Sequence, residues 1–188
     1  MKSIWVIVFA SLFFSHATIA ANNNQWHYIG LSGLIIDSNH QSGTTEGFVL
    51  DSRYELNDTF YLRGTYQNYN ALNTDNNRFF AGAGGRYHID PRYSLFAQID
   101  YVYLDSDAGF TSISTKYWIY NLGLYGKHNE FSYKLGLNRY DAISNNLRED
   151  TGVFAELFYD LTDKVTIGLE LESVNNSELY SLGARYHF

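Results

Sequence analysis

Hydrophobic and polar residues alternate along most of the chain with the period of two that is typical of β-strands. In residues 46–57, Phe48 and Leu50 share one face of the expected strand, whereas Asp51 and Arg53 share the other. The same division recurs down the chain, although the two faces of the first segment stay ambiguous. The pattern predicts ten strands, at residues 26–36, 46–57, 59–69, 79–89, 93–104, 116–127, 131–141, 151–160, 164–174 and 178–188.

Clusters of Asn, Asp, Gly and Ser separate these segments and predict turns. Tight links alternate with longer ones, which places the tight turns together at one end of the sheet. The single proline, Pro91, lies in a tight link, where it removes no hydrogen bond from a strand ladder. The tight links are residues 57–58, 90–92, 128–130 and 161–163, and the longer ones are residues 37–45, 70–78, 105–115 and 142–150.

An even number of antiparallel strands with no helix to cover an edge is most simply closed into a barrel. Alternation alone does not say which face points inward, because a soluble barrel also has one apolar and one polar face. Aromatic residues of the apolar face gather at both ends of the segments, as in the interfacial girdles of a membrane barrel. The polar face repeatedly carries glycine, which a crowded interior needs, at Gly82, Gly84, Gly123, Gly136, Gly168 and Gly183.

Charged residues of the polar face nearly balance, with six basic and seven acidic side chains, as a buried interior requires. We therefore predict an all-β fold, a closed antiparallel up-and-down transmembrane β-barrel of ten strands, with eight strands as the alternative. The predicted lumen charge network consists of Asp51, Arg53, Glu55, Arg63, Arg86, Asp100, Lys134, Glu156, Glu170, Glu172 and Arg185.

The first twenty residues have the order of a secretory signal, with Lys2 before an apolar run at 4–14 and small residues around Ala20. The run is shorter than the roughly 20 residues that a membrane-spanning helix needs. We therefore predict a signal peptide at residues 1–20 and a transmembrane barrel domain at residues 21–188. The chain has no cysteine, so disulfides cannot stabilise it, and its net charge of −7 gives no basic field for nucleic acid.

Residues 180–188 resemble the terminal assembly signal of Gram-negative outer-membrane β-barrel proteins. Its features here are a final phenylalanine and apolar or aromatic residues at every second position. The resemblance to small porin-like barrels implies Sec export, insertion by the barrel-assembly machinery and a place in the cell outer membrane, among outer-membrane lipid and lipopolysaccharide. The residues that carry the expected signal are Tyr180, Leu182, Gly183, Tyr186 and Phe188.

Candidate groups for catalysis lie in the longer links, at one rim of the expected barrel. His40 with Asp37 or Asp141 would supply a base and an orienting carboxylate, but loop composition often yields such pairs. The other candidates are Asp105, Asp107, Glu149 and Asp150. We predict no enzyme activity, no metal and no cofactor. The leading hypothesis is a structural or surface-interaction barrel with an occluded lumen; the alternatives are a narrow channel for small solutes and a rim enzyme acting on lipid A or peptides.

Overall fold

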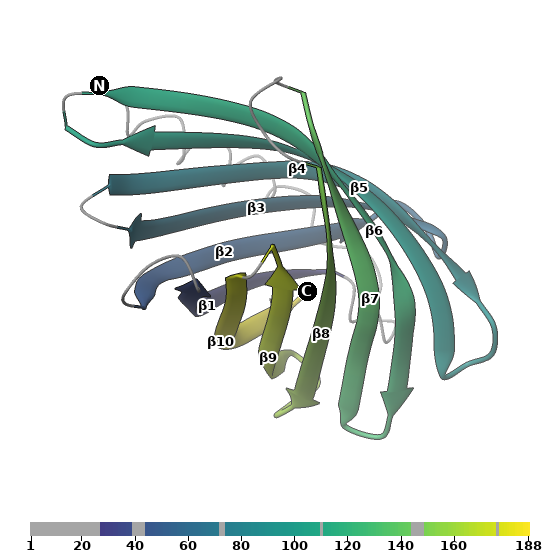
Figure 1. The fold of residues 1–188 in the computed structure, drawn as a ribbon. Coiled ribbons are helices and arrows are strands. Elements are labelled where there is room, and N and C mark those ends of the chain that lie inside the picture. Colours follow the sequence, from purple (N-terminus) through teal and green to yellow (C-terminus); the bar gives the residue numbers. More distant parts are fainter. Residues whose placement is uncertain (1–26, 39–43, 72–73, 110, 144–148, 176) are drawn as a thin grey trace.

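Ten antiparallel strands close into a barrel in the computed structural model, which describes residues 27–38, 44–71, 74–109, 111–143, 149–175 and 177–188 (Figure 1). Each strand pairs with the next, and β1 pairs with β10 to close the sheet. The strands are β1 (Tyr28–Ser38), β2 (Thr45–Glu55), β3 (Phe60–Ala71), β4 (Thr74–His88), β5 (Tyr93–Asp107), β6 (Ser112–His128), β7 (Phe131–Ala142), β8 (Asp150–Asp160), β9 (Val165–Val174) and β10 (Ser177–His187).

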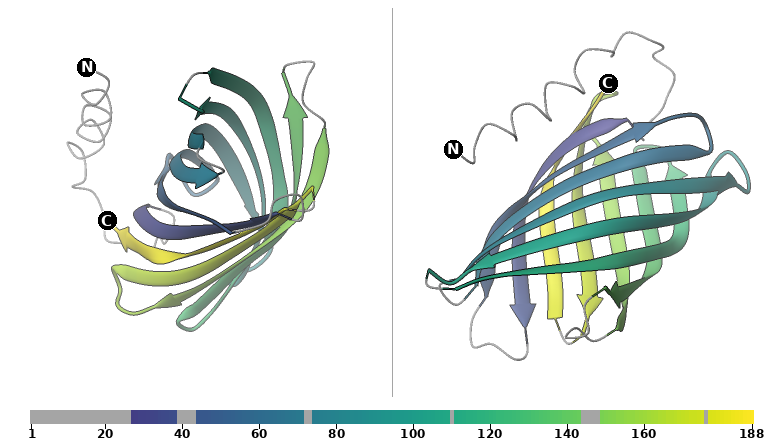
Figure 2. Two further views of the ribbon diagram at one scale, coloured as in Figure 1. Left: turned by 60° about the vertical axis from the view of Figure 1, so that its left-hand side comes forward. Right: turned by 90° about the horizontal axis from the view of Figure 1, so that it is seen from above.

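The closed all-β architecture and the count of ten strands confirm the prediction, and the alternative of eight strands is wrong. The described residues include no helix that is long and apolar enough to cross a membrane. The predicted signal peptide, residues 1–20, lies outside the described part of the chain. The strands wrap obliquely around the barrel, as the views in Figure 2 show, which is the tilt that closure of a sheet requires.

The apolar face of every strand points outward. Leu50 is 36% exposed, whereas its neighbour Asp51 is 5% exposed, and the contrast repeats along the sheet. The ambiguous first segment follows the same rule, because Tyr28 and Leu34 are buried inside while Leu31 is 60% exposed. An apolar exterior around a charged interior is the reverse of a soluble barrel and is the arrangement that a membrane barrel requires.

Several strands extend further than the alternation predicted, and β4 and β6 extend the most. β4 begins at Thr74 and β6 at Ser112, so most of the longer links expected at 70–78 and 105–115 are strand instead. The prediction was wrong there because polar side chains carry on the pairing. Asn70 donates to Asp75 (2.7 Å), and Ser106 donates to Asn76 (2.7 Å) on the other side of β4.

The links at the two ends of the barrel consequently differ less in length than predicted. We use "turn end" for the end that holds the links 56–59, 89–92, 129–130 and 161–164, and "loop end" for the opposite end. The two longest links, which join β1 to β2 and β7 to β8, are both at the loop end. Both ends of the described chain, His27 and Phe188, belong to the turn end, since β1 starts and β10 finishes there.

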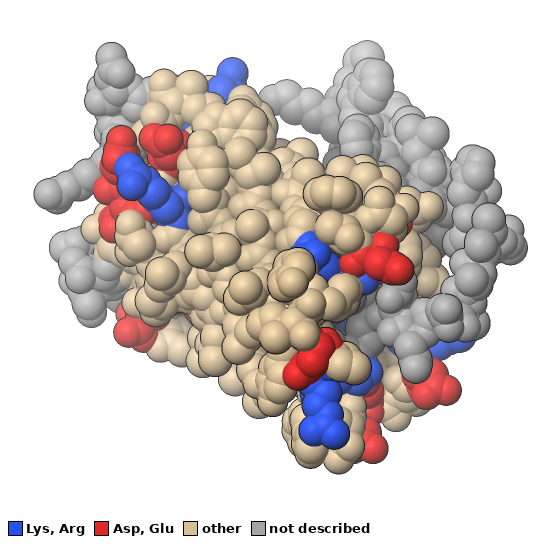
Figure 3. All heavy atoms as spheres, turned by 90° about the vertical axis from the view of Figure 1, so that its right-hand side faces the viewer, with Lys and Arg blue, Asp and Glu red and all other residues tan. Residues whose placement is uncertain are grey.

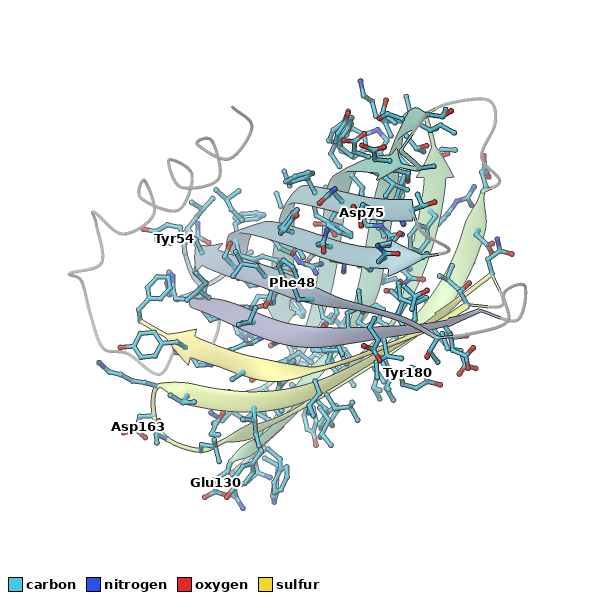
Figure 4. All side chains as sticks on the ribbon, turned by 90° about the vertical axis from the view of Figure 1, so that its left-hand side faces the viewer. Phe48, Tyr54, Asp75, Glu130, Asp163 and Tyr180 are labelled. Atoms are coloured by element: carbon cyan, nitrogen blue, oxygen red, sulfur yellow. The ribbon has the colours of Figure 1, made fainter. Side chains whose placement is uncertain are left out.

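Outward aromatic residues form a band at each end of the barrel. At the loop end, Tyr66 packs against Phe48 and Phe79, with ring centroids 5.8 and 4.9 Å apart. At the turn end, Phe131 packs against Tyr159 at 5.0 Å. In Figure 4 the labelled Tyr54 lies on the same side of the view as Asp163 and Glu130 of the turns, whereas Phe48 and Tyr180 lie further toward the opposite side. These bands match the girdles that anchor a barrel at the two membrane surfaces.

Inward glycines leave the space that inward rings occupy. Gly123 and Gly136 face each other across the β6–β7 pair, and the rings of Phe96 and Phe154, 6.1 Å apart, lie over them. A methyl group at Gly136 would overlap both the ring of Phe154 and the backbone carbonyl of Leu122. These glycines are therefore required by packing against large side chains, as the sequence predicted for a crowded interior.

We expect Gly136→Ala to lower the free energy of unfolding by about 1–3 kcal/mol, because the added carbon overpacks the interior. The matched control is Gly33→Ala on the outward face of β1, where only the carbonyl of Leu182 is near, at 4.0 Å, and the expected change is within about 0.5 kcal/mol. Urea unfolding of the barrel in lipid vesicles, followed by tryptophan fluorescence, measures both. Equal losses in the two variants would contradict the packing role.

Candidate functional site in the lumen

Arg185 is the centre of the lumen charge network. It lies on β10 with its guanidinium Nη2 2.5 Å from Glu170 Oε1 on β9, 3.4 Å from Asp51 Oδ2 on β2 and 3.8 Å from Glu156 Oε2 on β8. Strict alternation brings these four side chains inward, and closure of β1 onto β10 brings β2 within reach of β9. One cation thus meets three carboxylates that are far apart in the sequence.

Aromatic rings enclose this cation. The guanidinium carbon of Arg185 lies 3.9 Å from the ring centroid of Phe158 and 4.3 Å from that of Tyr28. A second arginine, Arg53, lies 4.4 Å from the ring centroid of Tyr61. Cation–π contacts strengthen when the pair is withdrawn from water, and Arg53 is only 5% exposed. Rings and guanidinium groups therefore fill the same layer of the lumen.

Three further ion pairs connect strands around the wall, one between neighbouring strands and two across an intervening strand. Their nitrogen–oxygen distances range from 2.5 to 3.5 Å, and the acidic partners are largely withdrawn from solvent. Because enclosed charges are stable only when paired, these contacts permit the barrel to hold so many of them. The pairs are Arg86 with Glu55 (2.5 Å), Lys134 with Glu156 (2.6 Å) and Arg63 with Asp100 (3.5 Å).

The uncharged side chain of Gln98 connects the cation Arg53 to the anion Asp100. Its carbonyl oxygen accepts hydrogen bonds from the Tyr61 hydroxyl (3.0 Å) and from Arg53 (3.4 Å), while its amide nitrogen donates to Asp100 (2.6 Å). The amide thus presents its acceptor to a cation and its donors to a carboxylate. Gln98 was not predicted from the sequence, although its inward position between Phe96 and Asp100 could have indicated it.

Toward the loop end, neutral partners replace ion pairs. Glu172 accepts hydrogen bonds from the Asn138 amide and the Tyr140 hydroxyl. Arg78 donates to the Tyr69 hydroxyl (3.2 Å) and weakly to Gln67 (3.5 Å). Glu172 was predicted to belong to the charge network, whereas Arg78 was not, because it lies outside the predicted β4 segment at 79–89.

At the turn end the network reaches solvent. Lys127 lies 3.2 Å from Asp160, and His27, just before β1, lies 3.7 Å from Glu55. Burial, together with the nearby Arg86 guanidinium, holds the pKa of His27 below its usual value. A neutral imidazole agrees with the hydrogen bond that His27 Nδ1 accepts from the backbone of Glu55 (3.2 Å).

The network borders two interior cavities. One, of about 100 Å³, reaches from Arg63 and Glu170 to Arg78 and Glu172. The other, of about 20 Å³, lies closer to the turn end and is lined by Tyr28, Phe158 and Arg185, among others. Arg53 and Lys134 border both cavities, so they stand at the boundary between the two spaces.

The rim candidates lie at the loop end without forming one cluster. Asp37 faces Glu178 across the β1–β10 pair, Asp105 accepts a hydrogen bond from Ser112 (3.2 Å), and Glu149 pairs with Arg139 (2.7 Å). Asp107 and Asp150 accept hydrogen bonds from nearby backbone, and Asp141 lies opposite Trp118. His40 lies outside the described residues, and within the described ranges no group of three or more acidic or histidine side chains is placed to hold a metal.

The predicted assembly signal lies on β10 and the residue after it. Tyr180, Leu182, Tyr186 and Phe188 are exposed on the outer surface, whereas Gly183 faces inward against Ser32. This placement makes the four large side chains accessible from outside the barrel. Their role in assembly stays a prediction.

Comparison with known proteins extends the fold assignment. No family model and no curated protein sequence matches the chain. Solved structures do match it. The KdgM porin in complex with disordered oligogalacturonate is 14% identical, with a TM-score of 0.53 over 86% of this chain and 99% of that one. The NanC porin is 11% identical, with a TM-score of 0.52 over 85% and 100% of the two chains.

A third structure, the translocator domain of the autotransporter NalP from Neisseria meningitidis, is 6% identical, with a TM-score of 0.52 over 98% of this chain and 94% of that one. The chain has the fold of an outer-membrane β-barrel. Identities this low carry fold and nothing finer, since one barrel architecture serves many roles. What the barrel does must therefore be argued from its own side chains.

We expect Arg185→Met to lower the free energy of unfolding by about 3–5 kcal/mol, because it removes the cation that Asp51 and Glu170 contact and leaves Glu156 with Lys134. The matched control is Arg139→Met, which breaks an exposed pair of similar length, 2.7 Å, and should cost at most about 1 kcal/mol. Adding Glu170→Gln to Arg185→Met should recover part of the loss. Urea unfolding in vesicles measures the stability of Arg185→Met, Glu170→Gln, the double variant and the control. If the loss of unfolding free energy in the double variant equals the sum of the losses in the two single variants, the two residues are not directly coupled.

Proposed function

We propose that this protein is an integral barrel of the outer membrane, non-enzymatic, whose lumen is closed by its own side chains and whose role is structural or in surface interaction. The observation that carries the proposal is the layer around Arg185, where guanidinium groups, carboxylates and aromatic rings from five successive strands, β8, β9, β10, β1 and β2, contact one another in the lumen. A solute would have to displace several ion pairs to pass this layer.

The sizes of the interior cavities support closure. Sites for small molecules commonly measure about 300–1,000 Å³. The interior cavities of about 100 Å³ and about 20 Å³ fall well below that range. They have room for a few water molecules beside the charged groups, which is the usual way in which enclosed polar groups complete their hydrogen bonds.

The exterior supports the location. An apolar band lies between two aromatic girdles, and a closed barrel leaves no strand edge to be satisfied by water. The two longest links belong to the loop end, which is the expected pattern for the extracellular side of such barrels. We therefore place the loop end outside the cell, and both the turn end and the start of β1 in the periplasm.

A narrow channel for small solutes is the second candidate. It is favoured by the position of Arg53 and Lys134, which border both cavities, because a change of rotamer in these long side chains would join the two spaces. Two of the similar structures are named as porins, which is compatible with this candidate at the level of fold. If solutes do pass, substitution of Arg63 or Glu170 should change ion selectivity.

Conductance in planar bilayers separates the two functions. We expect the native barrel to give no steady open current, because its lumen is closed. The variant Tyr61→Ala with Phe158→Ala removes two large rings and no charge, and we expect it to conduct. Heat-modifiable mobility in gels checks that each protein is folded. A steady current through the folded native barrel would replace the proposal with the channel.

A further inference from the structure

A groove of about 690 Å³ crosses the outer surface of the barrel over β4 to β7. It is several times larger than the interior cavities and falls within the size range of small-molecule sites. Figure 3 views the side where β5 and β6 lie and shows an uncharged expanse between groups of charged side chains. Among the described residues, this outer groove offers more room for a ligand than the two interior cavities do.

The strand register explains the shape of the groove. Its floor is made by Ala83, Gly85 and Ala97, which are adjacent outward positions of β4 and β5. Larger side chains stand on either side of the floor, with Phe60 paired to Gly85 from β3 and Leu122 paired to Ala97 from β6. Because these three residues are small and Phe60 and Leu122 beside them are large, a depression lies between the larger side chains.

A different chemistry marks the loop end of the groove. Tyr120, Arg139 and Thr151 are paired in sequence across β6, β7 and β8, and all three line it. Their side chains supply a guanidinium group and two hydroxyl groups, which are donors suited to a phosphate. Arg139 contacts Glu149 at 2.7 Å, but both side chains are about 60% exposed, and such exposed pairs contribute little.

The shape and charge together select the occupant. A two-fold dimer with its axis through the groove would set hollow against hollow and leave the groove empty. A flexible acyl chain fits an open apolar groove, and a phosphate at the Arg139 end completes a lipid. A phosphate monoester carries about −1.5 to −2 charges. It therefore competes with the singly charged Glu149 for the Arg139 guanidinium better than a phosphodiester does.

We propose that this groove binds one molecule of a lipid with a phosphate monoester headgroup, its acyl chain over Ala83, Gly85 and Ala97 and its phosphate at Arg139. In the outer leaflet of a Gram-negative outer membrane that lipid is lipid A. The inference rests on the outward orientation of the loop end proposed above. It does not depend on whether the lumen conducts.

The test uses the full barrel in detergent and counts bound lipid by native mass spectrometry, with lipid A and phosphatidylglycerol added in parallel. We expect saturable binding of one lipid A and much weaker binding of phosphatidylglycerol. Ala83→Leu with Ala97→Leu fills the groove, and Arg139→Gln removes the charge. Each should weaken lipid A binding on the order of tenfold or more, because apolar contact or a charge-assisted hydrogen bond is lost.

The matched control is Ala155→Leu with Ala184→Leu, which adds the same bulk to outward positions of β8 and β10, away from the groove, and should leave binding unchanged. Three results would overturn the proposal. These are equal binding of the two lipids, an equal loss of lipid A binding in the control variant, or a dimer of the native barrel that the groove-filling substitutions disrupt. Gel mobility confirms folding of every variant. If the barrel conducts but still binds lipid A, only the proposal of a closed lumen is refuted. If the barrel does not conduct and does not bind lipid A, only the proposal of a lipid site in the groove is refuted.

Discussion

An arginine enclosed in a narrow barrel needs acceptors beside it to offset its lost hydration, and Arg185 has carboxylates from three different strands. Asp51 approaches from beyond the seam where β1 and β10 pair, and Glu156 and Glu170 approach from the other side. The cation therefore ties together the region where the sheet closes. Phe158 covers one side of it and restricts water, which strengthens the remaining electrostatic contacts.

Most of the fold could be predicted because alternation is a local signal. The contrast between Leu50 and Asp51 separates the two faces of the strand, and the same contrast holds on every strand. Glycines such as Gly136 indicated a crowded interior before any partner was known, and the structure shows Phe154 above that position. The extension of β4 toward Thr74 could not be predicted, since its pairing depends on polar side chains that look like a loop in the sequence.

The partners within the lumen could not be predicted either. Sliding one strand by two residues along its neighbour preserves the alternation but changes every cross-strand contact, so alternation does not specify that Arg86 meets Glu55. The uncharged link at Gln98 depends on the same register. Outside the barrel, the groove over Gly85 and Ala97 likewise arises from register, because small residues on separate strands had to become neighbours.

The pairing of β1 with β10 has a consequence for how the chain is made. The two strands are hydrogen-bonded from Tyr28 opposite His187 to Ser38 opposite Ser177, so β1 gains its second neighbour only after β10 has been synthesised. Until then a growing sheet would expose two unsatisfied edges, which readily pair with other chains. This barrel therefore cannot close before its last strand is available, and until then its open edges can pair with other chains.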